Sequence, residues 1–320
     1  MRKIIIVTPT YNEELNISNF ILEVEKIMFS ISADYEHLII DNSSTDKTQL
    51  IIKEIAEKKK NLKAIFNLKN FGWVRSTYHA LIESSQLFNY KDKQDNVDFA
   101  VILISADFQD PISLIPEFIN LWKRNNKIVL GKKISSEENI LKFQIRKIFY
   151  KLINFLSEEK LTENTIGFGL YDQSVLRDLK KINDPYPYFR GLIAELGYQI
   201  KLVEYHQPVR KFGVSKMNML SLYDIAITGI VKHSKLPLRI MTILGFVASF
   251  FSLIISLGYL IYKILFWNTF VAGVAPLVVG LFALGFLNIF ILGLIGEYVL
   301  GILIHVRNIP HVFEKERINF

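Results

Sequence analysis

The sequence predicts an α/β domain with a largely parallel sheet, followed by a segment that enters a membrane. Three short apolar runs, residues 3–7, 37–40 and 99–104, are rich in β-branched side chains and precede polar loops. Such runs, when they alternate with helical patterns, are typical of strands buried in a parallel sheet. Farther along, residues 240–262 and 268–296 contain no charged side chain. Each of these stretches exceeds the roughly 20 apolar residues that a helix needs to cross a bilayer.

The elements of the α/β domain follow in order. Residues 14–29 and 46–58 carry apolar side chains at helical spacing, so we expect a helix after each of the first two strands. Residues 63–66 predict a further strand, and residues 74–84 predict the helix that follows it. A later strand is expected at residues 128–131.

Polar side chains follow the apolar runs at three places. In a parallel sheet, the loops at the carboxyl ends of the strands line one crevice, where ligands bind. The three loops carry Tyr11 and Glu13, then Asp41, then Asp107 and Gln109. Asp107 and Gln109 lie two residues apart, so both side chains can face the same side, and their oxygens suit a hard divalent cation. The crevice is therefore expected to bind a nucleotide and a metal ion.

Two further acids of these loops have structural alternatives. Asp110 is a third candidate metal ligand, although Pro111 after it could simply start a helix. Asp46 stands where the N-cap of the second helix is expected, and capping is as good an explanation of it as ligand binding.

Two segments predict helices that lie on a membrane surface. Residues 141–156 form a broad apolar face with aromatic side chains, bordered by lysine and arginine. A basic amphipathic helix of this kind fits the surface of a bilayer, while an ordinary helix packed on the sheet is the alternative. Residues 218–235 form a second candidate that leads directly into the first apolar stretch.

The expected organisation has four parts: a cytoplasmic catalytic domain at 1–217, a juxtamembrane amphipathic helix at 218–235, a transmembrane hairpin at 236–305 with spans at about 240–262 and 271–296, and a cytoplasmic tail at 306–320. Basic side chains flank both ends of the hairpin, whereas the connection between the spans offers only Lys263. Because positive charge favours the cytoplasmic side, we expect a multi-pass protein of the cell (inner) membrane with its catalytic domain in the cytoplasm. The chain begins with a strand pattern, with no secretory signal pattern before it.

The composition restricts the classes of partner and site. The chain has no cysteine, which excludes disulfides and cysteine-based metal sites, and its histidines do not follow the spacing of a zinc site. Its net charge is +7, which beside two membrane spans favours an anionic lipid surface or a phosphorylated substrate over nucleic acid.

Several motifs, taken in order, resemble those of family 2 glycosyltransferases with the GT-A fold. They are residues 8–14 (TPTYNEE), 41–46 (DNSSTD) and 106–111 (ADFQDP). Residues 167–172 (GFGLYD) and 210–216 (RKFGVSK), followed by two spans, are similar to the polyprenyl-phosphate glycosyltransferases. This group includes dolichol-phosphate mannose synthase and the bacterial bactoprenol glucosyltransferases. The resemblance covers nearly the whole chain.

The resemblance implies a Rossmann-like GT-A domain with a mixed sheet and an inverting transfer reaction. One sugar would move from a nucleotide-sugar of the UDP-glucose, UDP-GlcNAc or GDP-mannose class to polyprenyl (undecaprenyl or dolichyl) phosphate at the cytoplasmic face of the membrane. The implied cofactor is Mg²⁺ or Mn²⁺, bridging the diphosphate of the donor.

The resemblance also implies roles for individual residues. Those that would hold the base and ribose of the donor are Pro9, Tyr11, Glu13 and Asp41. Those that would bind the cation are Asp107 and Gln109. Those that would act on the reacting phosphates, directly or through the cation, are Asp107, Lys133, Arg146, Arg210, Ser215 and Lys216.

The chain departs from the family pattern at four positions. Ser105 replaces the first Asp of the usual Asp-x-Asp motif, and Lys133 replaces an Arg. Gly169 and Gln173 also replace residues that are usually Arg. Because a lysine is a point charge rather than a bidentate fork, these changes suggest a different sugar or a weaker grip on phosphate.

Two other functions fit the same residues. One is a glycosyltransferase with another lipid or glycan acceptor, although residues 206–211 (HQPVRK) lack the Trp of the Gln-x-x-Arg-Trp motif of processive synthases. The other is a catalytically lapsed membrane scaffold that still binds nucleotide-sugar, which Ser105 supports. The sequence leaves the oligomeric state open, since Asn288 and the glycines 280, 285 and 293 permit packing between spans.

Overall fold

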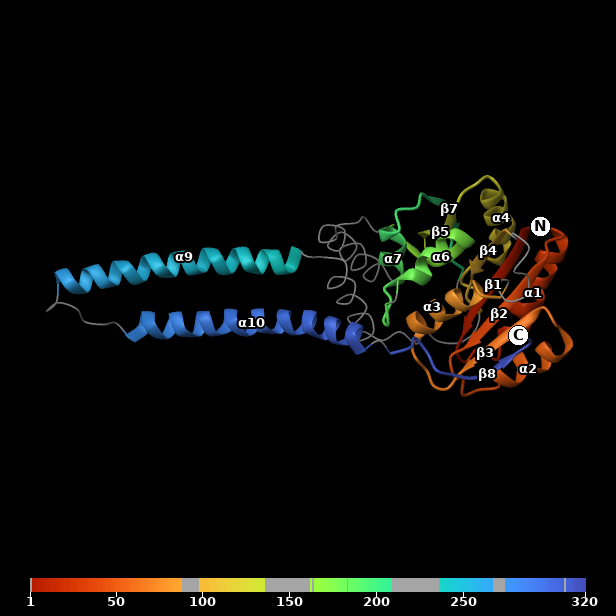
Figure 1. Ribbon diagram of the computed structural model, residues 1–320, viewed down its shortest axis with the longest axis horizontal. Helices are drawn as coiled ribbons and strands as arrows, with labels where there is room; N and C mark the ends of the chain where they lie inside the picture. The colour runs from red at the N-terminus through yellow and green to blue at the C-terminus, as the bar shows by residue number, and fades with distance from the viewer. Residues whose placement is uncertain are drawn as a thin grey trace.

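A computed structural model describes residues 2–87, 98–135, 162, 164–182, 184–208, 236–266, 274–307 and 309–320. An α/β domain forms one end of the molecule, and two long helices extend from it side by side (Figure 1).

One sheet of eight strands forms the centre of the domain, in the order β7-β5-β6-β4-β1-β2-β3-β8. The first four strands in the chain are β1 (Arg2–Thr10), β2 (Tyr35–Asp41), β3 (Leu62–Asn67) and β4 (Asp98–Leu103), and they pair in parallel in the order β4-β1-β2-β3. The remaining strands are β5 (Ile128–Ser135), β6 (Thr165–Asp172), β7 (Ile200–His206) and β8 (Glu314–Ile318). Because β6 runs antiparallel to both β4 and β5, the sheet is mixed, as expected.

Helices cover both faces of this sheet. One face packs against α1 (Ile17–Ser30), α2 (Thr48–Lys58) and α4 (Ile115–Lys123), which follows the short 3-10 helix η1 (Ile112–Leu114). The other face packs against α3 (Trp73–Ser84), α6 (Gln173–Lys181) and α7 (Phe189–Glu195). Alternate residues of a strand therefore enter different cores: Ile4 and Ile6 of β1 enter the first, and Ile5 and Val7 enter the second. This double burial explains why the strands read as continuous apolar runs.

The two long helices are α9 (Leu236–Leu265) and α10 (Val274–Arg307), and they contact each other. Within the residues that the structure describes, the segment Leu287–Arg307 of α10 is long and apolar enough to cross a membrane. The described part of α9 contains a shorter apolar segment, Leu236–Ala248. The two helices were expected, whereas the crossing of a bilayer by both remains a prediction.

The end of the chain adds a strand to the sheet. Residues 306–320 were expected to form a tail, but β8 within them pairs antiparallel with β3, with Arg317 opposite Ile65. Asn319 extends this contact, because its Nδ2 donates to three carbonyl oxygens, those of Ala56 (2.7 Å), Lys59 (3.2 Å) and Leu62 (2.8 Å). The chain thus leaves the domain, runs out and back through α9 and α10, and returns to the same sheet.

Ionic contacts attach β8 to α3. Glu314 of β8 contacts His79 Nε2 at 2.6 Å and accepts from Arg317 Nη2 at 2.7 Å. Arg317 Nη2 also donates to Glu83 at 2.7 Å. Burial opposes the charge of Glu314, but the hydrogen bonds from His79 and Arg317 hold the pKa of its carboxyl down to about 2.

This pKa predicts how the C-terminal strand responds to acid. A carboxyl with a pKa lowered from 4.5 in the folded state stabilises the fold above about pH 4.5, and this contribution is lost as the pH falls toward 2. We expect Glu314→Gln to lower the thermal unfolding midpoint in detergent at pH 7, and the difference from the wild type to shrink as the pH falls from 4.5 to 2. Glu57→Gln, an exposed change on α2, is the control and should show no such difference. A difference for Glu314→Gln that stays constant across this range would contradict the assignment.

Candidate active site

The loops that follow β1 and β2 are joined to each other by hydrogen bonds. The backbone N–H of Asn12 donates to Ser44 Oγ at 2.8 Å, and the Thr45 N–H donates to Asn12 Oδ1 at 2.7 Å. The Glu13 N–H donates to Thr48 Oγ1 at 2.8 Å. The two loops therefore form one wall at the carboxyl edge of the sheet.

Two of the predicted donor-binding acids lie buried in this wall. The Asp41 carboxylate accepts from the Ser44 N–H at 2.9 Å, from Ser44 Oγ at 2.5 Å and from Gln49 Nε2 at 2.6 Å. Burial raises the pKa of Asp41, and these hydrogen bonds oppose that effect. Glu13 is mostly buried and accepts from Asn16 Nδ2 at 2.7 Å. Both carboxylates are thus held in fixed orientations by neighbours in the same wall.

The other two predicted donor-binding residues lie beside them. Pro9 is the register partner of Ile40 in the β1–β2 pair, and Tyr11 follows the end of β1. Both side chains are half-buried. The structure therefore brings all four predicted donor residues to one end of two adjacent strands.

The acidic loop after β4 lies at the same edge of the sheet, because β4 is the parallel neighbour of β1. Asp107 Oδ1 accepts from the Gln109 N–H at 3.1 Å, and Phe108 between them has a φ of 60°. The side chains of Asp107 and Gln109 are partly exposed, whereas Ala106 and Asp110 on either side are buried. The loop thus presents the two predicted cation ligands at the protein surface.

Asp110 is the anchor of this loop. It is 2% exposed, its Oδ2 accepts from the Ser105 N–H at 3.2 Å, and the Tyr205 hydroxyl of β7 donates to its Oδ1 at 3.5 Å. Burial, helped by the nearby charge of Asp107, raises the pKa of Asp110 to about 7. The side chain proposed as a third metal ligand is therefore directed into the protein, where it ties the loop to β7.

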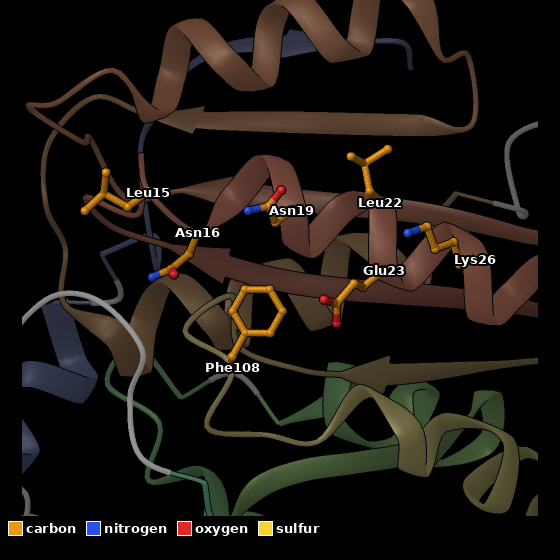
Figure 2. A pocket seen from close by; sticks show the side chains of 7 residues that line it. All are labelled: Leu15, Asn16, Asn19, Leu22, Glu23, Lys26 and Phe108. Carbon is orange, nitrogen blue, oxygen red and sulfur yellow. The ribbon is translucent and has the colours of Figure 1, made fainter.

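Phe108 fixes the loop on its other side. Its ring meets that of Phe20 of α1 edge-on, with 5.7 Å between centroids. Figure 2 shows Phe108 beside α1, where it lines a groove together with Asn16, Asn19 and Glu23. The acidic loop is thus held between α1 and β7.

The donor atoms of this loop fit a hard divalent cation. Asp107 supplies carboxylate oxygen and Gln109 supplies an amide oxygen, which are the ligand types that Mg²⁺ and Mn²⁺ accept. In the described part of the chain, no three His, Asp or Glu side chains gather into a group that could hold a metal by themselves. A cation bound here would therefore need further ligands from water or from the phosphates of a donor.

Lys133 lies on the strand next to Tyr205. It is mostly buried in β5, and its register partner across the β5–β7 pair is Tyr205. Register partners in a parallel pair point to the same face, so this lysine lies on the face where Tyr205 reaches Asp110. The other predicted phosphate-facing residues, Arg146, Arg210, Ser215 and Lys216, lie outside the described residues, as do the expected surface helices 141–156 and 218–235.

Two departures from the family pattern have a structural explanation. A Cβ atom on Gly169 would lie 2.3 Å from the carbonyl oxygen of Val129, because β5 and β6 approach closely there, so no side chain fits. Gln173 is the first residue of α6, and its Nε2 donates to Asp98 Oδ1 at 3.2 Å. The backbone of β5 thus requires a glycine at position 169, and Gln173 has a hydrogen-bond partner in Asp98.

A cluster of asparagines, which sequence reasoning missed, connects the loop after β3 to the same wall. Asn42 follows Asp41, and its Nδ2 donates to Asn70 Oδ1 at 2.8 Å. Its Oδ1 accepts from Asn67 Nδ2 at 3.1 Å and from the Phe71 N–H at 3.0 Å. The sequence did offer one signal of this cluster: asparagines stand at the ends of two strands, β2 and β3, that are consecutive in the chain.

A family comparison assigns the chain. Residues 5–180, more than half of the chain, match the model of "Glycosyl transferase family 2". The chain belongs to this family. It is therefore a glycosyltransferase by family, as the sequence motifs indicated.

Relatives that match nearly the whole chain include bactoprenol glucosyl transferases. The chain is 30% identical to the "SfII prophage-derived bactoprenol glucosyl transferase" of Shigella flexneri, over 98% of each chain. It is 29% identical to the "Prophage bactoprenol glucosyl transferase homolog" of Escherichia coli, over 96% of this chain and 97% of the relative. It is also 29% identical to the "Putative glycosyltransferase CsbB" of Bacillus subtilis, over 97% of this chain and 91% of the relative.

The solved structures that resemble the chain are more distant. Glucosyl-3-phosphoglycerate synthase from Mycobacterium tuberculosis, in complex with Mn²⁺, UDP and glucosyl-3-phosphoglycerate, is 16% identical with a TM-score of 0.48, over 72% of this chain and 78% of that one. Staphylococcus aureus TarS is 18% identical with a TM-score of 0.42, over 72% of this chain and 66% of that one.

The raised pKa of Asp110 predicts how the active-site loop responds to pH. The folded protein keeps this proton up to about pH 7, whereas the unfolded chain releases it near 3.8, so ionisation of Asp110 lowers stability as the pH rises through this window. In EDTA, we expect the unfolding midpoint of the wild type to fall relative to Asp110→Asn between pH 4 and pH 7. Asp34→Asn, a change of a mostly exposed acid, should give a profile parallel to that of the wild type. Parallel profiles for Asp110→Asn as well would mean that Asp110 is ionised throughout.

Proposed function

We propose that the protein transfers one sugar from a nucleotide-sugar to a polyprenyl phosphate at the cytoplasmic face of the membrane, with inversion of the anomeric carbon. The observation that carries this proposal is the position of the acidic loop. Asp107 and Gln109 stand at the carboxyl edge of β4, beside the wall that contains Glu13 and Asp41. A nucleotide in that wall would extend its diphosphate toward the acidic loop.

The donor side of the reaction needs stabilisation of a leaving diphosphate. A divalent cation on Asp107 and Gln109 would supply Lewis-acid stabilisation of the charge that develops on that diphosphate. Pro9, Tyr11, Glu13 and Asp41 would hold the base and ribose, which fixes where the sugar carbon lies. Lys133, mostly buried on the face of the sheet where Tyr205 reaches Asp110, would add positive charge near the acidic loop.

The acceptor side needs no strong general base. A lipid phosphate is already an anion, so its oxygen can attack once it is correctly aimed. Attack from the face opposite the leaving group would invert the anomeric carbon in one step. We assign the binding of the acceptor phosphate and the donor phosphates to Arg146, Arg210, Ser215 and Lys216, because cations and hydroxyls recognise phosphate oxygens.

The membrane setting rests on the path of the chain. α9 leaves the α/β domain, and the residues after α10 return to its sheet as β8, so both ends of the helix pair lie on one side. Apolar side chains are exposed along both helices, which supports a hairpin in which each helix crosses the bilayer. Lys235 and Arg239 flank one end of the pair, and His305 and Arg307 flank the other, which favours the cytoplasm for the catalytic domain.

Relatives named for bactoprenol support a polyprenyl phosphate acceptor and make a glucosyl donor the first to test. The purified protein would be incubated in detergent with undecaprenyl phosphate, Mg²⁺ or Mn²⁺, and radiolabelled UDP-glucose, UDP-GlcNAc or GDP-mannose. A labelled lipid that is labile to mild acid and absent with EDTA is the expected product. Binding of a nucleotide-sugar without any lipid product would favour another acceptor or a lapsed enzyme.

The proposal predicts a specific effect of Asp107. Loss of a cation ligand should remove several kcal/mol of transition-state stabilisation, so we expect Asp107→Asn to slow transfer by about 100-fold or more. Asp178→Asn on α6 replaces a half-buried acid that pairs with Lys181 on the same helix, outside the donor wall and the acidic loop, and it should transfer at the wild-type rate. Unchanged turnover by a folded Asp107→Asn protein would remove this residue from the mechanism.

A further inference from the structure

A group of exposed apolar side chains lies where the chain returns from α10 to the sheet. Leu68 and Trp73, on either side of the loop after β3, are 58% and 49% exposed. Phe313, immediately before β8, is 48% exposed, and Ile309 near the end of α10 is also exposed. Large apolar side chains that gather at one place on a surface mark a site of interaction.

Hydrogen bonds and a ring contact join the loop after β3 to the returning segment. The Leu68 N–H donates to the Phe313 carbonyl oxygen at 2.8 Å, and the rings of Phe71 and Phe313 lie 6.1 Å apart. Arg75 Nη2 donates to the carbonyl oxygen of Pro310 at 2.8 Å, so the start of α3 is tied to the same returning segment. We call this surface, formed by residues 68–75 and 309–313, the return patch.

Positive charge accompanies the apolar side chains. Lys69 Nζ lies 5.2 Å from the centroid of the Phe71 ring, and the Arg75 guanidinium carbon lies 5.3 Å from it. Arg307 ends α10 just before the patch. The nearby carboxylates Glu83 and Glu314 are both engaged by Arg317. An apolar surface with tryptophan and cations matches the boundary of a bilayer, where tryptophan sits at headgroup level and lysine and arginine meet anionic lipids.

The chain length places the patch close to the end of the candidate span. Leu287–Arg307 is long and apolar enough to cross a membrane, and six residues lead from Arg307 to Phe313. Even fully extended, six residues reach only about 20 Å. Figure 1 shows α3 at the end of the domain that the long helices approach.

We infer that the return patch is a docking surface for the anionic headgroup layer of the membrane that holds α10. The inference rests on the proposed membrane setting and adds a second contact to it, one made by the catalytic domain itself. The patch is continuous with the donor wall, because Asn42 next to Asp41 binds both Asn70 and the Phe71 N–H. Docking would therefore fix the height of the donor site above the lipid that supplies the acceptor phosphate.

The absence of cysteine from the natural chain allows a direct test. Leu68→Cys in the full-length protein would carry an environment-sensitive fluorophore in proteoliposomes of phosphatidylcholine with phosphatidylglycerol. Phe29→Cys near the end of α1, 85% exposed, is the control, because α1 ends just before β2 begins and Phe29 therefore lies at the opposite, amino edge of the sheet. Leu292→Cys, inside the candidate span, reports whether α10 is inserted.

Docking predicts that the fluorophore at 68 shifts its emission to the blue and is quenched by lipids labelled near the headgroup, while the fluorophore at 29 is not. Lys69→Glu in the Leu68→Cys protein should reduce this quenching, as should omission of phosphatidylglycerol. If the fluorophore at 292 is quenched and the one at 68 behaves like that at 29, the patch does not dock, although the membrane setting stands. If neither 292 nor 68 is quenched, the proposed membrane setting itself is wrong. Quenching at 68 that is unaffected by Lys69→Glu and by lipid charge would overturn the assignment to anionic headgroups.

Discussion

The parallel pairing of β4, β1, β2 and β3 is the constraint on which the rest of the structure depends. Parallel strands present their carboxyl ends at one edge, so residues that are far apart in the sequence, such as Glu13, Asp41 and Asp107, reach the same place. Burial on both faces fixes the register, since a slip by one residue would exchange the two cores. The side chains of the polar loops are then available to bind ligands, because the strands and the helices packed on them supply the two hydrophobic cores.

The C-terminal strand extends this constraint to the helices. β8 pairs with β3, and the segment before it also binds the loop after β3 through Leu68 and Arg75. That loop is in turn bound to Asn42, next to Asp41. The loop after β3 thus connects the segment that follows α10 to the donor wall. The helix pair and the site are parts of one folded unit rather than an enzyme with a separate anchor.

The sequence predicted the features that rest on local pattern, and it missed those that rest on pairing. The apolar runs of β1, β2, β3 and β4 and the polar loops after them were visible because double burial leaves continuous hydrophobic stretches. β8 was not visible, because its sequence EKERI belongs to an edge strand in which exposed and half-buried residues alternate. The contact of Tyr205 with Asp110 joins residues 95 positions apart, and only the sheet order reveals it. The glycine at position 169 is likewise explained only by the close approach of β5 and β6, which the sequence does not reveal.

The central claim is that the wall and the acidic loop form one nucleotide site that a cation completes. Isothermal titration of the purified protein with UDP, in Mn²⁺ and then in EDTA, tests it most directly. The account predicts that UDP binds tightly only with the cation, and that Asp107→Asn loses this dependence while UMP, which lacks the second phosphate, binds both proteins alike. Binding of UDP that is equal with and without the cation, or equal in the two proteins, would contradict the account.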